Sequence, residues 1–232
     1  MVRTTATFSQ QIWDFLKDST PARRRQRYGD VDYDWEHRVD TTGATVSFRN
    51  RLLGMFHSPY QPTDEQAFRE MIGGLKVNYS QFTFIDLGSG KGRTLLMAAE
   101  YNFRRVVGVE LLPELHQVAE DNIRKFQEAG KANVSIASVL ADARYFEFPL
   151  EPTVLYLFNP FPEPVLEEVI SRLDRSLQEH PRALYVVYHN PLLEPVVASA
   201  PALKLVTRSP QHAVYASAAQ IPDPVRDSEH LM

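Results

Sequence analysis

Hydrophobic residues between positions 82 and 188 occur in two alternating patterns along the chain. Short continuous apolar runs predict buried strands, and longer stripes at a spacing of three or four residues predict amphipathic helices. The runs lie at residues 82–87, 105–110, 133–140, 153–158 and 183–188. The stripes are formed by Leu115, Val118, Ala119, Ile123 and Phe126, then by Leu166, Ile170, Leu173 and Leu177, and a further helix is predicted over 91–102. Because strands and helices alternate, the pattern predicts a parallel sheet covered on both faces.

The flanking regions differ from this core. Two short strands over 203–207 and 213–216 are close enough to pair antiparallel. Near the start, an apolar stripe over 8–16 predicts a short helix, and a second helix over 65–75 has Thr63 or Asp64 as its N-cap. We therefore divide the chain into a mostly helical extension over 1–80, a sheet domain over 81–220 and a flexible tail over 221–232.

Composition removes several classes of function. The chain has no cysteine, so disulfides, thiolate nucleophiles and cysteine-based metal sites are excluded. Its seven histidines show no metal-ligand spacing, and we expect no metal. The net charge of −4 provides no overall basic field for nucleic acid. No apolar run reaches membrane-spanning length, and residues 1–11 do not resemble a secretory signal, so we expect a cytoplasmic protein without a membrane partner.

The first predicted strand runs into a glycine-rich loop, Asp86-Leu87-Gly88-Ser89-Gly90-Lys91-Gly92. Glycines allow a tight turn and the close approach of a ligand. The third glycine comes one position too early for the G-x-G-x-x-G dinucleotide fingerprint, and the G-K-[ST] of a Walker A loop is missing. A carboxylate at Asp86 would repel a pyrophosphate but would suit the ammonium group of a methionine moiety. The alternative is a simple tight turn between strand and helix.

Acidic residues follow the next two strands. Glu110 ends the second strand, 20 residues after Gly90, where nucleoside-binding α/β proteins place a carboxylate that accepts both ribose hydroxyls. Asp142 follows the third strand, where a carboxylate can accept the adenine amino group. The alternatives are an exposed strand-end glutamate and an aspartate that caps a short helix.

Together these segments resemble the successive motifs of class I S-adenosylmethionine-dependent methyltransferases. The resemblance rests on residues 84–93, 106–110 and 141–143 and extends over about 55–217. It implies a Rossmann-like, doubly wound, seven-stranded and mostly parallel sheet with one antiparallel strand. It also implies that S-adenosylmethionine is the cofactor and that the extension contributes to its cover. The implied cofactor contacts are Asp86, Gly88, Ser89, Gly90, Glu110, Leu111 and Asp142.

Within the class, the segment Tyr60-Gln61-Pro62-Thr63 resembles the protein-lysine methyltransferase branch that includes the histone-core enzymes. There a Tyr-x-Pro-Thr segment lies over the cofactor, so the resemblance adds Tyr60 and Thr63 as cofactor contacts. This chain departs from the branch at Lys91, where most relatives carry an acidic residue.

A third motif, Phe158-Asn159-Pro160-Phe161, follows the fourth strand and resembles the Asn/Asp-Pro-Pro-aromatic motif of amino-nitrogen methyltransferases. An Asn159 oxygen and a backbone carbonyl fixed by Pro160 can accept hydrogen bonds from an amine, and Phe161 can wall a lysine channel. Positioning then dominates catalysis. The motif here has a single proline before the phenylalanine, and the alternative is a turn that ends the strand.

We therefore predict a methyltransferase acting on an amino nitrogen, first of all a protein lysine, with Asn159, Pro160 and Phe161 as catalytic residues. The alternatives are N-methylation of a nucleic-acid base or small amine, a non-catalytic nucleoside-binding module, and a nicotinamide-dependent oxidoreductase. The expected partner is a methyl-acceptor substrate, a protein or else a nucleic acid. The arginine-rich run 23–27 is more typical of a solvated face than of a binding site. The sequence carries no signal for the oligomeric state.

Overall fold

The computed structural model describes residues 31–42 and 62–219. The helix expected over 8–16, the arginine-rich run 23–27 and Tyr60 lie outside these residues. No helix in the described parts of the chain is long and apolar enough to cross a bilayer.

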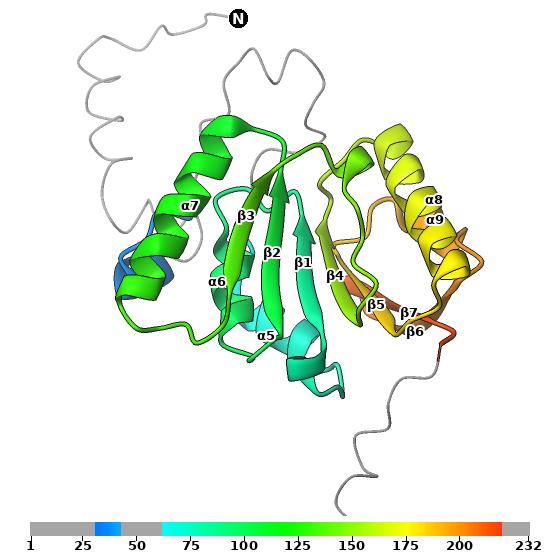
Figure 1. The fold of residues 1–232 in the computed structure, drawn as a ribbon, viewed down its shortest axis with the longest axis horizontal. Helices are drawn as coiled ribbons and strands as arrows, with labels where there is room; N and C mark the ends of the chain where they lie inside the picture. The colour runs from blue at the N-terminus through cyan, green and yellow to red at the C-terminus, as the bar shows by residue number, and fades with distance from the viewer. Residues whose placement is uncertain (1–30, 43–61, 220–232) are drawn as a thin grey trace, which may run out of the picture.

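The core of the fold is a seven-stranded sheet in the order β3-β2-β1-β4-β5-β7-β6 (Figure 1). The strands are β1 (Thr83–Leu87), β2 (Arg105–Glu110), β3 (Ile136–Leu140), β4 (Thr153–Phe158), β5 (Leu184–His189), β6 (Leu203–Arg208) and β7 (His212–Ser217). The first five strands pair in parallel, and β7 runs antiparallel to both β5 and β6. The predicted fold class is confirmed, including the single antiparallel strand.

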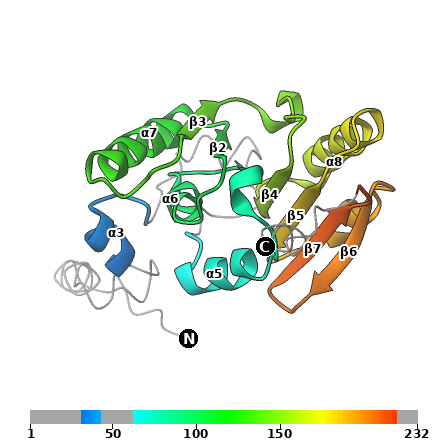
Figure 2. The ribbon, with the colours of Figure 1, turned by 60° about the horizontal axis from the view of Figure 1, so that its bottom comes forward.

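Helices cover both faces of this sheet. The described helices are α3 (Val31–His37), α5 (Glu65–Gly73), α6 (Arg93–Ala99), α7 (Pro113–Glu128), α8 (Glu163–Glu179) and α9 (Glu194–Ala198), with 3-10 turns η1 (Tyr79–Gln81) and η2 (Ala143–Tyr145). Figure 2 shows α5, α6 and α7 on one side of the sheet and α8 on the other. The arrangement is doubly wound, as the alternation of strands and helices predicts.

Two hydrophobic clusters fill the layers on either side of the sheet, because successive residues of a strand point to opposite faces. Phe84 and Tyr156 belong to the cluster under α5, α6 and α7, whereas their neighbours Ile85 and Leu157 belong to the cluster under α8 and α9. The central strands are buried on both faces, which explains their continuous apolar runs. The edge strands β3 and β6 are mostly exposed.

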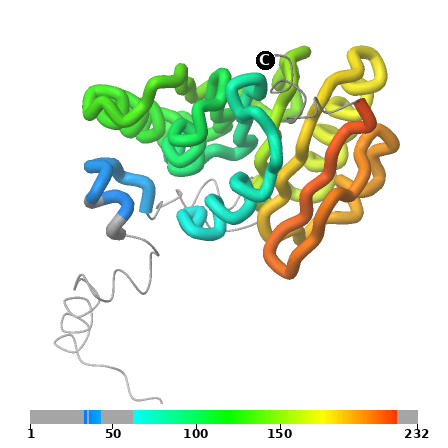
Figure 3. The backbone as a smooth tube through the Cα atoms, turned by 90° about the horizontal axis from the view of Figure 1, so that it is seen from below, coloured from blue at the N-terminus to red at the C-terminus, as the bar shows by residue number. Residues whose placement is uncertain are grey.

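Helix α3 lies where the sequence pattern shows only an acidic and aromatic stretch. It lies beside α7 in Figures 2 and 3. The centroid of the His37 ring is 5.5 Å from that of the Phe126 ring of α7. Tyr33 is buried in the same cluster as the core of α6. Hydrophobic periodicity does not reveal this helix because it is short and is held by a few specific contacts.

The order of the strands reverses at β1, so that β2 and β4 lie on either side of it. Chain segments leave β1 and β4 in opposite directions at this switch point, and ligands of open α/β sheets bind in the resulting crevice. The glycine-rich loop follows β1, and Asn159 follows β4. The topology therefore brings both predicted motifs to the same crevice.

Candidate functional site

The loop after β1 depends on glycine at three positions. Gly88, Gly90 and Gly92 have φ angles of 82°, 56° and 80°, in the left-handed region that favours glycine. A Cβ placed on Gly88 would lie 2.6 Å from the Cβ of Pro160. At Gly88 the loop thus packs directly against the segment after β4. It also delays the start of α6 to Arg93, two residues later than the sequence pattern predicts.

Glu110 is fixed at the end of β2 by its own carboxylate. One oxygen accepts a hydrogen bond from the Gly90 amide at 2.8 Å, and the other accepts one from the Leu112 amide at 2.8 Å. Burial raises the pKa of this carboxyl group, and the backbone hydrogen bonds lower it again. A carboxylate has about four acceptor positions. Glu110 therefore retains acceptor capacity for the two hydroxyls of a ribose.

An apolar surface adjoins Glu110. Leu111 is 43% exposed, and Leu140, which pairs with Glu110 across β2 and β3, is 49% exposed. Exposed leucines beside a buried carboxylate suit a flat base attached to a sugar. Together with the glycine loop, these residues fit the adenosine part of S-adenosylmethionine.

Asp142 lies next to Glu110, because the Ala141 amide donates to the Glu110 carbonyl at 3.0 Å. Its carboxylate caps η2 through the Arg144 amide and forms an ion pair with the Arg144 guanidinium at 2.6 Å. The Arg144 side chain holds the pKa of Asp142 below its usual range. Asp142 therefore caps η2, as its position in the sequence also suggests. It stays ionised beside the apolar surface formed by Leu111 and Leu140.

Asp86 is a buried acid directly before the loop. Its carboxyl group accepts a hydrogen bond from the Thr94 hydroxyl. Burial raises its pKa from 3.8 to about 7, and the nearby Glu110 contributes in the same direction. A carboxyl group poised near neutrality ionises when a cation approaches. Asp86 thus fits the ammonium group of the methionine moiety.

Ser89 turns away from the other predicted contacts. Its Oγ lies 2.5 Å from the place where a Cβ would stand on Gly108, so the hydroxyl is directed against β2. It is buried and has no hydrogen-bond partner among the described residues. The Ser89 amide donates to the carbonyl of Val109 at 3.1 Å. The structure therefore places this side chain in the packing between the loop and β2.

Thr63 is brought to the crevice but is bound by protein groups. Its Oγ1 lies 3.3 Å from the Tyr156 hydroxyl, and its carbonyl accepts from the Arg93 Nε at 2.8 Å. It is buried. Tyr60, the other residue of the same motif, lies outside the described residues.

Asn159 has a left-handed backbone conformation at the end of β4, with a φ angle of 44°. Its Oδ1 accepts from the Tyr188 hydroxyl at 2.9 Å and, over a longer 3.4 Å, from the Leu192 amide. Its Nδ2 donates to the Asn190 carbonyl at 2.5 Å. Asparagine adopts left-handed backbone more readily than most residues, and Asn102 and Asn190 share this conformation. We call this group, formed by Asn159, Tyr188 and Asn190, the acceptor corner.

The other two residues of the motif have different surroundings. Pro160 covers Gly88, whereas Phe161 is partly buried against the cluster under α8. Phe161 thus supports the wall of the crevice from the α8 side.

Sequence reasoning missed the residues that attach the N-terminal segments to this loop. Arg93 is fully buried, donates to Thr63 and to the Thr41 hydroxyl, and lies over the Tyr33 ring at 4.2 Å. Lys91 forms an ion pair with Asp40 at 2.8 Å. An arginine at the start of a helix looks like a surface residue in the sequence, and only the tertiary contacts reveal its role.

Asn122 of α7 completes the attachment. Its Oδ1 accepts from the Asp40 amide at 2.9 Å, and its Nδ2 donates to the carbonyls of Asp40 and Lys91 at 2.8 and 3.0 Å. The departure at Lys91 from the related branch is thereby explained, because the lysine here has a carboxylate partner in the N-terminal segment.

Comparisons with known proteins agree with this site. Residues 58–133 match the family described as "Histone methylation protein DOT1". A "Protein-lysine N-methyltransferase" of Saccharolobus islandicus is 34% identical over 119 residues, which cover 48% of this chain and 70% of the relative.

Two solved structures are similar to this chain, and the first of them shares its fold. A predicted N6-adenine-specific DNA methylase from Listeria monocytogenes superposes with a TM-score of 0.52 at 14% identity, covering 72% of this chain and 54% of that one. An RNA methyltransferase from Salinibacter ruber, solved with S-adenosyl-L-homocysteine, has a TM-score of 0.46 at 23% identity, covering 72% of this chain and 97% of that one.

The predicted cofactor and enzyme class are confirmed, since residues 58–133 match a histone methylation family and the sequence relative is a methyltransferase. With a third of its aligned residues shared over more than two thirds of that relative, the chain belongs to the class I S-adenosylmethionine-dependent methyltransferases, in the branch of the protein-lysine N-methyltransferases.

Proposed function

We propose that the protein methylates the side-chain amine of a lysine in a protein substrate. One observation carries this proposal, namely that the acceptor corner lies directly against the cofactor loop through the contact of Pro160 with Gly88. An amine held by Asn159 would thus stand beside the methionine end of the cofactor. The sequence relative named a protein-lysine N-methyltransferase supports lysine as the acceptor.

The bound cofactor supplies an electrophilic methyl group on a sulfonium. The chain itself supplies position. Tyr188 and the Asn190 carbonyl fix the amide of Asn159 from both ends. The 3.4 Å contact of its Oδ1 with the Leu192 amide is weak, so this oxygen can instead accept a hydrogen bond from the substrate amine. A fixed hydrogen-bond acceptor orients the nitrogen lone pair toward the methyl group, and this positioning raises the rate of transfer.

The acceptor must lose a proton before it can attack. His189, which follows Tyr188 in β5, has its pKa lowered to about 4 by burial and by His212. It is therefore neutral at pH 7 and too weak a base for an alkylammonium group, whose pKa is about 10. We infer that the proton leaves to water and that the corner selects the neutral amine.

Cofactor binding divides among the other predicted residues. We propose that Glu110 accepts the ribose hydroxyls, that Asp142 accepts the adenine amino group and that Asp86 pairs with the ammonium group. Gly88 and Gly90, which have no side chain, and the apolar Leu111 would line the cofactor site without polar side-chain contacts. Thr63 would support the wall of the cofactor site through its contact with the Tyr156 hydroxyl. The roles of Tyr60 and Ser89, the division into an extension, a cofactor domain and a tail, and the cytoplasmic location stay predictions.

The test is a labelling experiment with the full chain, radiolabelled cofactor and a cell extract. We expect the label in protein, and after hydrolysis in methyllysine. Label in nucleic acid or in small amines would show that the methyl acceptor is one of these and not lysine. The variant Asn159→Ala should lose turnover while keeping its affinity for the cofactor, measured by calorimetry. A non-catalytic binding module would show no turnover in either protein.

A further inference from the structure

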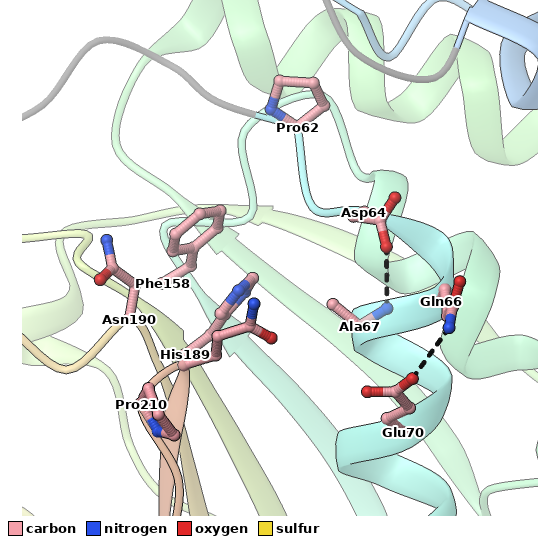
Figure 4. Close-up of a pocket in the computed structure, with 10 residues that line it drawn as sticks. Pro62, Asp64, Gln66, Ala67, Glu70, Phe158, His189, Asn190 and Pro210 are labelled. Carbon is pink, nitrogen blue, oxygen red and sulfur yellow. Dashed lines mark hydrogen bonds between the residues drawn. The ribbon is translucent and has the colours of Figure 1, made fainter.

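A cavity lies beside the acceptor corner, between α5 and the ends of β4 and β5 (Figure 4). Its volume is about 520 Å³. Helix α5 forms one wall, and the ends of β4 and β5 form the other, with the turn between β6 and β7 at its edge. This volume is enough for an extended side chain and part of a peptide backbone.

The cavity is continuous with the acceptor corner through two residues. Phe158 lines it and is followed directly by Asn159. Asn190 also lines it, and its carbonyl accepts from the Asn159 Nδ2 at 2.5 Å. A polypeptide whose lysine reaches Asn159 therefore passes the mouth of this cavity with its neighbouring residues.

The wall formed by α5 is acidic. Asp64 and Glu70 line the cavity, and both are exposed. Asp64 accepts from the Ala67 amide at 2.9 Å, and Glu70 accepts from the Gln66 side chain at 3.0 Å, as Figure 4 shows. Each carboxylate forms only this one hydrogen bond among the described residues, so each has acceptor positions left.

Within the part of the chain that the structure describes, no positive side chain lining the cavity balances these two carboxylates. Among the described residues that line it, none is lysine or arginine. The cation nearest in sequence, Arg69, pairs with Glu65 at 2.5 Å. His189 on the opposite wall is neutral at pH 7. The cavity therefore carries a local negative charge, and none of the described residues that line it neutralises this charge.

The wall opposite α5 is aromatic. The rings of Phe158 and His189 stack with centroids 4.1 Å apart, at 20° to one another. The hydrogen bond of 2.8 Å between the His189 Nδ1 and the Tyr156 hydroxyl fixes the histidine ring. A flat aromatic wall facing carboxylates suits a group with an apolar stem and a cationic end.

We propose that this cavity binds the side chain of a second basic residue, lysine or arginine, located near the acceptor lysine in the substrate polypeptide. The inference rests on the proposed function and adds a determinant of specificity to it. The two carboxylates would hold the cationic end, and the Phe158–His189 wall would contact the stem. The protein would thus prefer lysines in basic segments.

The test uses pairs of peptides that carry one acceptor lysine and differ at the flanking positions. One peptide of each pair has arginine there, and the other has the neutral isostere citrulline. The matched variants are Glu70→Gln, Asp64→Asn, which keeps a side chain able to cap α5, and their combination. Glu167→Gln, an exposed acid of α8 on the other side of the sheet, is the control.

Exposed carboxylates contribute modestly, so each single variant should raise the KM for the arginine peptide about two- to fivefold, and the pair about tenfold. The effect should shrink at high salt. The KM for the citrulline peptide and the affinity for the cofactor should not change. Equal KM values of wild type and the double variant for the arginine peptide would overturn the inference.

Peptide binding measured by fluorescence anisotropy separates this inference from the proposed function. If the wild type binds the arginine peptide through Glu70 but transfers no methyl group to lysine, the cavity assignment stands and the proposed function is lost. If lysine is methylated and neither carboxylate affects binding, the function stands and the cavity assignment is lost. Failure of the wild type to distinguish arginine from citrulline also overturns the assignment.

Discussion

The Cβ of Pro160 lies 2.6 Å from the point at which a side chain would begin on Gly88. The glycine loop and the segment that carries the acceptor corner are therefore in direct contact, with the proline ring between their backbones. In the proposed function this contact would couple the cofactor site to the acceptor site. A change at Gly88 would then act on both sites together.

Gly88→Ala should lower both stability and cofactor affinity. The φ of 82° alone costs about 1–3 kcal/mol for alanine, and the overlap with Pro160 adds to it. Gly130→Ala is the matched control, because its φ is 68° and no atom lies within 4 Å of the new Cβ. Urea unfolding and calorimetry check the pair. A Gly88→Ala protein no less stable than Gly130→Ala, with full cofactor affinity, would contradict the contact.

Glu110→Ala should weaken cofactor binding by about 1–3 kcal/mol, which is roughly a 5- to 150-fold rise in Kd, because both ribose hydroxyls lose their acceptor. The variant also leaves the amides of Gly90 and Leu112 without their partner, so part of the loss is loosening of the loop. Calorimetry with S-adenosylhomocysteine measures the effect. Unchanged affinity would remove Glu110 from the cofactor site.

The pKa of Asp86 gives stability a specific pH dependence. Burial raises this pKa from 3.8 to about 7, so the folded state holds a proton that the unfolded state releases. The resulting contribution to stability is complete below about pH 3.8 and is lost as the pH rises through about 7. In Asp86→Asn this loss should disappear, and the variant should gain stability relative to the wild type between pH 5 and pH 8.

Cofactor affinity should change in the opposite direction. An ammonium group pairs with the ionised form of Asp86, so we expect the affinity of the wild type to rise from about pH 5.5 to pH 7.5. Calorimetric titrations of wild type and Asp86→Asn across this range make the comparison. The same slope in both proteins would show that Asp86 does not face the ammonium group.

The sheet and its two motifs could be predicted from sequence because each depends on local pattern. Continuous apolar runs identify strands that are buried on both faces, and Gly88 follows such a run directly. Glu110 could be placed beside the loop because the carboxyl ends of neighbouring parallel strands meet. These inferences need only the order of elements along the chain.

The remaining parts of the site depend on contacts between residues far apart in sequence. Asn122 of α7 joins Asp40 to the Lys91 carbonyl, across 82 and 31 positions respectively. The Tyr188 hydroxyl reaches Asn159 across 29 positions. No local pattern indicates such pairs, because a tyrosine in a buried strand looks the same whether or not its hydroxyl has a functional partner.

Arg93 should be needed for stability. It is fully buried, and its guanidinium approaches Asp34, Thr41 and Thr63. Removing the charge in Arg93→Met leaves the buried Asp34 carboxylate without its cation, which costs about 3–5 kcal/mol. Arg124→Met, which removes only surface pairs on α7, should change stability by less than about 1 kcal/mol. Equal urea midpoints of the two variants would contradict the role of Arg93.

Tyr188→Phe should reduce turnover without loss of cofactor. Its hydroxyl donates to the Asn159 Oδ1 at 2.9 Å and accepts from the Leu193 amide at 3.3 Å. Without this donor the Asn159 amide can rotate, and the acceptor amine is held less accurately, so kcat should fall about tenfold to a hundredfold. Tyr185→Phe, on the opposite face of the same strand, is the control. Since burial raises the pKa of Tyr188, its hydroxyl stays protonated. The ratio of the kcat of Tyr188→Phe to that of the wild type should therefore be constant from pH 6 to pH 9. A ratio that changes with pH would show that Tyr188 transfers a proton instead of positioning Asn159.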